Sequence, residues 1–475
     1  MSVEMLAIVV TLLLLALVSI ELPVGVAMIV AGGVGVLVHD GAEGMLNLWE
    51  NAPYGATAKY ALVVVPMFVL LGAVVSHAGI GERIFAAFNR LVGWLPGGLA
   101  ASTVLATAMF SGISGSSAAD VAAFGRVAIN QMGRHGYDKT YAAAVVAAAG
   151  TFAVLIPPSI GIIIYALLAE VSIGAMLLAG VLPGITSCLI LAAFVILQSR
   201  KRVRNGVAAP AETVSAETVS AGSASAESAG APALEPPRRV GLRDLFRRGE
   251  GQAGSDFSGL VYAVVLFVIV MGGLYSGFFT STESGAVGAA AALLMAILAV
   301  RFWPRRLVGV VVPALRDTAS ITSMIFLLLI GGTVFNYFTA TTGIARDITT
   351  AIANLGIPGK LTIVLLLVVL LLLGTVMDGL TIMLLTVPLV APIITELGFD
   401  GIWFGILMLK MVEIGLITPP VGLNVYIISG IVPDVRAEQV FRKIAPFVVL
   451  DLAVTSLFFL FPDFVLWLPR QAGLA

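Results

Sequence analysis

The sequence predicts an all-α membrane protein that crosses the bilayer many times and consists of two inverted-topology repeats. Hydrophobic residues make up 59% of the 475 residues and charged residues only 11%, with a mean hydropathy of +1.06. Soluble domains are about 45–50% apolar and about 25% charged, so that class is excluded. Apolar runs recur along nearly the whole chain, and several approach the roughly 20 residues that a spanning helix needs. Matching Pro-Pro motifs, one in each half, indicate the repeat.

The first apolar run, residues 5–20, has neither a basic region before it nor a small-residue cleavage site after it. We therefore expect a retained helix and not a signal peptide. The single cysteine, Cys188, excludes a disulfide framework and a Cys-ligated metal site within one chain. The three histidines are scattered along the sequence, which favours loop or interface positions over a metal cluster.

A segment of different composition, residues 199–257, separates the two halves. It has Arg and Lys at both ends and a low-complexity Ala/Ser/Glu/Thr tract between them, with AETVS twice in succession. Such a tract cannot bury enough apolar surface to offset its ordering entropy, so we expect a disordered tether. Its basic ends predict a cytoplasmic location. The predicted organisation is a first membrane repeat at 1–198, the linker at 199–257 and a second membrane repeat at 258–475.

Both halves contain a Pro-Pro pair inside an apolar stretch: Pro157-Pro158 in LIPPSIG and Pro419-Pro420 in ITPPVG. Proline has no backbone N–H and clashes with the preceding turn, so both stretches are predicted to be broken helices. A membrane tolerates broken backbone only where protein or a wet cavity satisfies the freed groups. One such break can be a harmless kink, but a matched pair in two halves indicates a transporter site.

A second irregular element lies upstream of each break. It is FSGISGSS at residues 110–117 in the first half and GTVMDGLT at residues 374–381 in the second. Each lies between apolar arms too short to span separately. Gly and Ser permit a tight tip whose polar groups face protein and not lipid. We therefore predict one re-entrant helical hairpin in each half.

We predict five crossings in each half in addition to the hairpin. They lie near residues 3–19, 21–38, 61–77, 140–169 and 175–198, and near 259–276, 283–301, 318–338, 401–430 and 444–468. Because five is odd, the second half starts from the opposite face and the repeats are inverted. A cytoplasmic linker then places the N-terminus outside, and the first hairpin opens to the cytoplasm and the second to the periplasm. The distribution of Lys and Arg agrees, since only four fall outside: Lys59, Arg346, Lys360 and Arg470.

The motifs together resemble a known family. In the first half they are FSGISGSSAADVAAFG at 110–125, GYD at 136–138, the IPPSI core and AEVSIG at 169–174. In the second they are Asp378, Pro388, Pro392 and EIGLITPPVGLN at 413–424. From about residue 6 to residue 460, without the linker, the chain is similar to the large membrane subunit of TRAP (tripartite ATP-independent periplasmic) transporters, the DctM-like family.

The resemblance implies a Na⁺-coupled, elevator-type importer of small organic acids, such as C4-dicarboxylates or sugar acids, in the bacterial inner membrane. It implies two partners: a periplasmic substrate-binding protein and a small four-helix TRAP membrane subunit. The sequence shows no spare four-helix block, so we expect the small subunit to be a separate chain. The sequence does not distinguish dicarboxylate, keto acid, sugar acid and sialic acid as the solute.

Sodium prefers hard oxygen ligands, and unwound helix segments supply carbonyls without competing partners. We therefore expect at least two Na⁺ sites at the hairpin tips and breaks. The candidates are, for the first site, Ser114, Ser116, Ser117, Gly150 and Thr151, and for the second, Gly374, Asp378, Thr381, Gly415 and Thr418. Ser159 and Asn424, just beyond the Pro-Pro pairs, are the candidates for substrate binding, because half-helix N-termini favour carboxylates. For any one Ser or Thr, bonding to its own helix is an equal alternative.

Charged residues within membrane segments also indicate function, because burying them is costly. Asp378 and Glu413 lie near the inferred site, whereas Glu283 follows TST and fits a helix cap better. The chain departs from the family at Lys410, where an apolar residue is common, and at Ala153, where glycine is common. Lys410 is expected to snorkel or to pair with Glu413 three residues on.

Three other functions remain open at this point. An intramembrane enzyme would need a convergent catalytic set, and the sequence contains none, so we predict no enzyme. A passive channel does not require paired inverted hairpins. A Na⁺/carboxylate symporter of similar architecture that works without a binding protein is the nearest alternative.

Overall fold

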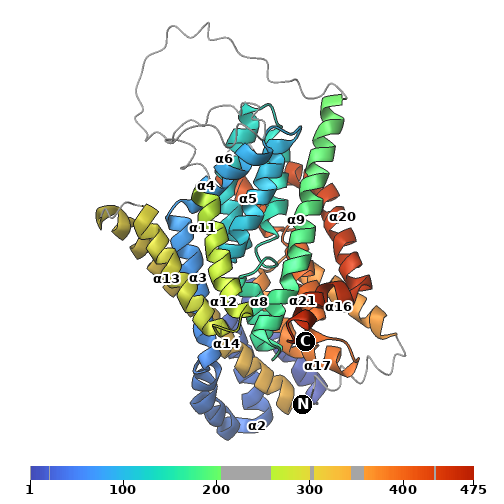
Figure 1. Ribbon diagram of the computed structural model, residues 1–475. Helices are drawn as coiled ribbons and strands as arrows, with labels where there is room; N and C mark the ends of the chain where they lie inside the picture. The colour runs from blue at the N-terminus through green and yellow to red at the C-terminus, as the bar shows by residue number, and fades with distance from the viewer. Residues whose placement is uncertain are drawn as a thin grey trace, which may run out of the picture.

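The computed structural model describes residues 2–20, 22–204, 258–299, 304–343, 358–432 and 435–474, and the regular structure in these ranges is entirely helical (Figure 1). The predicted linker lies outside the described residues from 205 to 257. The first half comprises α1 (Val3–Ser19), α2 (Val24–Thr57), a 3₁₀ turn (Tyr60–Val63), α3 (Val64–His77), α4 (Ile80–Val92), α5 (Gly98–Ser114), α6 (Ser117–Arg134), α7 (Lys139–Gly150), α8 (Ile160–Leu168) and α9 (Ile173–Arg204).

The second half begins with one helix that contains a π-helical turn: α11 (Ser258–Phe267), the turn at Val268–Gly272 and α12 (Gly273–Tyr275). It continues with α13 (Ser281–Ala299), α14 (Pro304–Thr341), α16 (Gly359–Gly374), α17 (Gly379–Glu396), α18 (Gly401–Gly415), α19 (Leu423–Ile431), α20 (Ala437–Leu460) and α21 (Pro462–Gln471). Seven helices among the described residues are long and apolar enough to cross a membrane.

One group of helices, which we call the frame, consists of α2, α3, α13 and α14. Its centre is the crossing of α2 and α14, where glycines bring the two backbones together. A Cβ added at Gly331 would lie 2.4 Å from the carbonyl oxygen of Gly25, and one added at Gly32 would lie 2.9 Å from the Cα of Phe335. Small residues permit such close approach, which strengthens van der Waals packing where no hydrophobic effect operates between helices.

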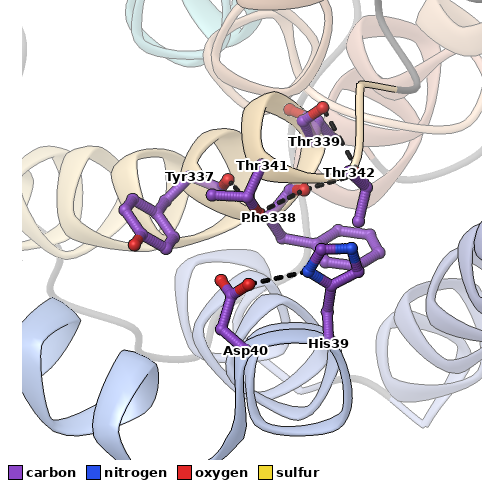
Figure 2. A network of polar contacts seen from close by, with 7 residues as sticks. All are labelled: His39, Asp40, Tyr337, Phe338, Thr339, Thr341 and Thr342. Carbon is purple, nitrogen blue, oxygen red and sulfur yellow. Dashed lines mark hydrogen bonds and ion pairs between the residues drawn. The ribbon is translucent and has the colours of Figure 1, made fainter.

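At one end of this crossing α2 bends at Gly41, whose φ of 76° and ψ of −170° are not helical. Just before the bend, His39 Nδ1 lies 2.7 Å from Asp40 Oδ1, beside the last turn of α14 (Figure 2). In that turn the Thr342 hydroxyl donates to the Phe338 carbonyl at 2.6 Å. The same carbonyl also accepts from the backbone N–H of Thr342 at 3.1 Å, so the hydroxyl adds a second bond at the end of the helix.

A second group of helices, which we call the carrier, contains the broken helices and the hairpins. Helix α7 ends at Gly150 and α8 begins at Ile160, while α18 ends at Gly415 and α19 begins at Leu423. The breaks predicted at the Pro-Pro pairs are therefore present, and both Pro-Pro peptide bonds are cis. The arms α7 and α18 are buried almost throughout, so the breaks lie inside protein, as irregular backbone in a membrane requires.

The predicted hairpins are α5 with α6 and α16 with α17. Gly115 forms the first tip with φ 62°, a left-handed conformation that glycine adopts without steric cost. The second hairpin packs tightly on the broken helix, since a Cβ added at Gly415 would lie 2.6 Å from the Cα of Gly374. Figure 1 shows α5 and α6 at the end where α9 finishes and α17 at the opposite end, near both termini.

The structure also contains helices that the sequence reading did not predict. They are α4, the part of α2 beyond Gly41, the first turns of α14 and the separate C-terminal helix α21. The crossing predicted at 444–468 instead ends at Leu460, where Phe461 and Pro462 start α21. The inverted relation of the halves and the crossings assigned to each half stay predictions.

Candidate functional site

A cavity of about 410 Å³ lies between the frame and the carrier, within the usual size range of small-molecule sites, about 300–1,000 Å³. Helices α3 and α14 of the frame form one wall. Both hairpin tips and both helix breaks form the other, through residues 114–119, residues 378–380, Ile160, Gly161, Leu416, Leu423 and Asn424, among others. The four irregular elements that the sequence singled out therefore meet at one place.

The first turns of four helices converge on this cavity. They belong to α6, α8, α17 and α19, and each contributes at least two lining residues. The first turn of a helix presents backbone N–H groups without intrahelical partners and the positive end of the helix dipole. Such an end favours an anion, and four of them around one cavity create a region of positive potential without a basic side chain.

The side chains that line the cavity carry the opposite charge. Asp317, Asp378 and Glu413 are among them, and none of the lining residues within the described ranges is Lys, Arg or His. Asp317 also lies 2.7 Å from His77 Nε2 through Oδ2, which links the interior of α14 to the C-terminal end of α3. The cavity therefore combines acidic side chains, which attract cations, with helix N-termini, which attract anions.

Glu413 joins the two halves of the chain at this cavity. Its side chain is 1% exposed, and its two oxygens accept from the Ser117 hydroxyl at 2.6 and 2.8 Å. A hydroxyl has one proton and can satisfy only one carboxylate oxygen at a time. The Glu413 carboxylate therefore retains acceptor capacity next to the cavity, where a cation can use it.

A second buried carboxylate lies behind the first hairpin tip. Asp120 is fully buried in the first turn of α6 and accepts hydrogen bonds from the hydroxyls of Ser111 and Ser114. These bonds tie the end of α5 to the start of α6, so Asp120 fixes the shape of the tip. The predicted Na⁺ ligand Ser114 lines the cavity with its hydroxyl committed to Asp120.

Asn424 is a buried polar lining residue whose side-chain amide has no partner among the described residues. Its side chain is fully buried in the first turn of α19, and neither Nδ2 nor Oδ1 has a hydrogen-bond partner among the described residues. Its backbone N–H donates to the Leu416 carbonyl at 3.0 Å and so closes the break. A buried amide without partners costs free energy, which makes it a candidate for contact with a bound molecule.

Five of the predicted site residues line the cavity: Ser114, Ser116, Ser117, Asp378 and Asn424. Two of them cap helices. Asp378 Oδ1 accepts from the backbone N–H of Leu380 and Thr381 at 3.1 Å, and Ser116 accepts from Ala119. Ser159, predicted for substrate binding, instead caps α8 and donates to the Val154 carbonyl at 2.9 Å, outside the cavity lining.

The other predicted residues lie behind the lining. Gly150, Gly374 and Gly415 allow close packing, and a Cβ at Gly150 would lie 2.5 Å from a methyl of Val121. Thr151 and Thr418 donate to carbonyls of their own helices at 2.8 and 2.6 Å, which is the alternative foreseen for single threonines. Thr381 donates its hydroxyl to Asp378. Whether any of them binds Na⁺ stays a prediction.

The sequence did not indicate Asp120 or Asp317 as parts of this region, and it indicated Glu413 only as a charged residue near the site. Asp120 carried a readable signal, because it is an acidic residue three positions after Ser117, the last serine of the predicted hairpin tip. The partner of Lys410 was also misjudged. Lys410 is 1% exposed and pairs with Asp451 of α20, not with Glu413, because the two helices face each other there.

Comparison with known proteins identifies the family of this chain. The family model "Tripartite ATP-independent periplasmic transporter, DctM component" matches residues 11–464. The chain belongs to this family. It is accordingly a transporter subunit and not an enzyme, and an inner-membrane protein with several membrane-spanning helices.

Several relatives are named as large permease proteins of TRAP transporters. The chain is 32% identical over 430 residues to the C4-dicarboxylate TRAP transporter large permease protein DctM of Pseudomonas aeruginosa, covering 90% of each chain. It is 28% identical to the sialic acid TRAP transporter large permease protein SiaM of Vibrio cholerae, covering 96% of each. Among solved structures, the YdaH transporter of Alcanivorax borkumensis has the same fold, with a TM-score of 0.59, 14% identity and coverage of 89% and 90%.

Proposed function

We propose that this chain is the large permease subunit of a Na⁺-coupled, binding-protein-dependent importer of small organic acids. The observation that carries the proposal is the cavity in which both hairpin tips, both helix breaks and four helix N-termini meet. Relatives named for C4-dicarboxylate, sialic acid and 2,3-diketo-L-gulonate transport support an anionic organic solute. A small four-helix TRAP membrane subunit and a periplasmic substrate-binding protein are the proposed partners.

Sodium coupling follows from the charges around the cavity. An organic acid that enters must lie near Asp378 and Glu413, and like charges in a site of low dielectric constant repel each other. A cation bound beside these carboxylates removes the repulsion and stabilises the anion in turn. Substrate and cation then bind with positive coupling, as a symporter requires. The carboxylate of Glu413 and the carbonyls at the breaks are hard oxygen ligands that suit Na⁺.

The anion itself is expected at the first turns of α8 and α19. These half-helices start at Ile160 and Leu423, directly after the breaks, and both residues line the cavity, so the positive ends of the two helix dipoles lie at its wall. Asn424 adds an amide without a partner at the same place. A carboxylate of the substrate can accept from both the amide and the backbone, which satisfies the buried donor.

An elevator mechanism accounts for the division into frame and carrier. The frame contributes one wall of the cavity, while every candidate ligand lies on the carrier. A rigid movement of the carrier would therefore transfer the whole site while the α2–α14 crossing stays fixed. Rigid-body movement of one helix bundle against another is a recurring route to alternating access in transporters with paired broken helices.

The transport proposal is tested by uptake into proteoliposomes that contain the permease, the cognate small subunit and the binding protein. We expect uptake only with an inward Na⁺ gradient and the binding protein present, and none when K⁺ replaces Na⁺ at equal ionic strength. Uptake that is indifferent to Na⁺ would refute coupling. Uptake that needs Na⁺ but no binding protein would favour the alternative, a symporter that works alone.

The elevator is tested with cysteine pairs in a Cys188→Ala background. A pair at Gly332 of α14 and Leu385 of α17 joins frame and carrier. Leu385 packs against a buried cluster from α1, α2 and α14, and the carbonyl oxygen of the preceding Leu384 is 3.9 Å from a Cβ added at Gly332. Joining them with a short thiol reagent should stop transport, and cleaving the link should restore it. The control pair at Met67 and Gly285 lies within the frame, where a Cβ at Gly285 is 3.2 Å from that of Met67. If the first link leaves transport intact, the elevator proposal fails.

A further inference from the structure

The buried ion pair between Lys410 and Asp451 lies outside the large cavity and joins α18 of the carrier to α20. Lys410 extends from α18 with a side chain only 1% exposed, and its Nζ contacts Oδ1 of Asp451 on α20. Charged side chains are rarely buried to this degree in a membrane protein unless they have a functional partner. Neither residue takes part in the site described above.

A small cavity adjoins this ion pair. It measures about 10 Å³ and is lined by residues of α7, α9 and α20, among them Thr151, Ser187 and Asp451. A space of this size holds one water-sized particle, provided that polar groups surround it. Its walls contain two hydroxyls and one carboxylate, so it suits a single small polar or charged ligand.

Two of these polar groups lack partners. Oδ2 of Asp451 and Oγ of Ser187 are both buried, and neither has a hydrogen-bond partner among the described residues. Ser187 is 3% exposed and belongs to α9, which contributes to the cavity wall together with α7 and α20. Carboxylate, hydroxyl and carbonyl oxygens are the ligands that hard cations prefer. The small cavity therefore has the ligands of a cation site and, beside them, the ammonium of Lys410.

We propose that Lys410 is a built-in cation: its ammonium neutralises Asp451 and takes the place of one Na⁺ that the site of Asp451, Ser187 and Thr151 would otherwise bind. A buried carboxylate without a partner is strongly disfavoured, so removing the ammonium leaves a vacancy of the right charge, size and ligand type. The residue at position 410 therefore helps to determine how many Na⁺ ions the protein binds. This inference goes beyond the proposed function, because the small site is separate from the large cavity.

The test is equilibrium binding of radioactive Na⁺ to the purified chain, with choline holding the ionic strength constant. Lys410→Met should bind one Na⁺ per protein more than the unmodified chain. Lys410→Met/Asp451→Asn should return to the unmodified value, and Ser187→Ala in the Lys410→Met background should weaken the additional binding about tenfold. The matched control is Lys443→Met, which removes an exposed lysine of α20 whose Nζ lies 3.8 Å from Asp138 and should change nothing.

The proposal is overturned if Lys410→Met binds the same amount of Na⁺ as the unmodified chain at neutral and mildly alkaline pH. If the variant cannot be purified without Na⁺, its yield in Na⁺ and in choline gives a second measurement. Rescue by Na⁺ that disappears in the double variant supports the proposal, and equal yields refute it. An unmodified chain that binds no Na⁺ would refute Na⁺ coupling at the large cavity, yet the gain of one ion in Lys410→Met would still be observed.

Discussion

Replacement of Asn424 by Leu should make the protein more stable and weaken its binding and uptake of substrate. The side chain is fully buried, and both polar atoms of its amide lack partners among the described residues. A buried polar group left without a hydrogen bond costs about 1–3 kcal/mol, and leucine of similar size removes that cost. We therefore expect the free energy of unfolding to rise by about 1–3 kcal/mol, which for a chain of this size corresponds to a few degrees in Tm.

The same change removes the amide that we assign to the substrate carboxylate. A hydrogen bond to a charged group contributes about 1.5–3 kcal/mol, so substrate affinity should fall about 10-fold to 100-fold. Thermal unfolding in detergent and uptake in proteoliposomes measure the two effects on the same preparation. The control is Asn51→Leu, which changes an exposed amide on α2 that donates to the Asn47 carbonyl and should alter neither value. A less stable Asn424→Leu variant with normal uptake would refute the reasoning, because Asn424 would then be a structural residue.

Three further predictions concern the large cavity and the carrier helices around it. Glu413→Gln should keep the contact with Ser117 but lower the apparent Na⁺ affinity of uptake by about tenfold or more; an unchanged Na⁺ dependence would remove Glu413 from the cation site. Gly415→Val should destabilise the protein by at least about 1–3 kcal/mol, because a Cβ added at this position would lie 2.6 Å from the Cα of Gly374. An unchanged Tm would contradict this packing. Tyr165→Phe should lower the free energy of unfolding by about 1 kcal/mol, because the 2.7 Å hydrogen bond to the Gly401 carbonyl is lost. The Na⁺ dependence of uptake should stay normal, and a shift in it would show that Tyr165 has a role in the site.

Much of the fold could be predicted because its signals are local. Apolar runs, the Gly115 tip and the Pro-Pro pairs each act through a few neighbouring residues, so the helix breaks and the hairpins could be placed from spacing alone. Helices beyond these signals were missed. The bend at Gly41 depends on one glycine among several, and α21 starts from a single Phe-Pro step inside an apolar stretch.

The site could be predicted only in outline, because its contacts are not local. Ser117 and Glu413 are 296 positions apart, and no spacing rule joins them. For Lys410 the sequence indicated only Glu413 as a partner, three residues on, whereas the packing of α18 against α20 selects Asp451, 41 positions away. Serines and threonines were harder still, since a hydroxyl that faces a site and one that bonds to its own helix have the same sequence signal.

The crossing of α2 and α14 has a consequence for how the protein is made. Gly25 and Gly331 lie in different halves of the chain, so the closest helix contact of the frame joins segments separated by about three hundred positions of synthesis. While the first half is emerging from the ribosome, the small-residue face of α2 has no helix to pack against. That face stays open to lipid or to membrane chaperones until α14 has been inserted. Maturation of the frame is therefore a late event in biogenesis, and a chain truncated before α14 exposes a surface that quality-control proteases can recognise.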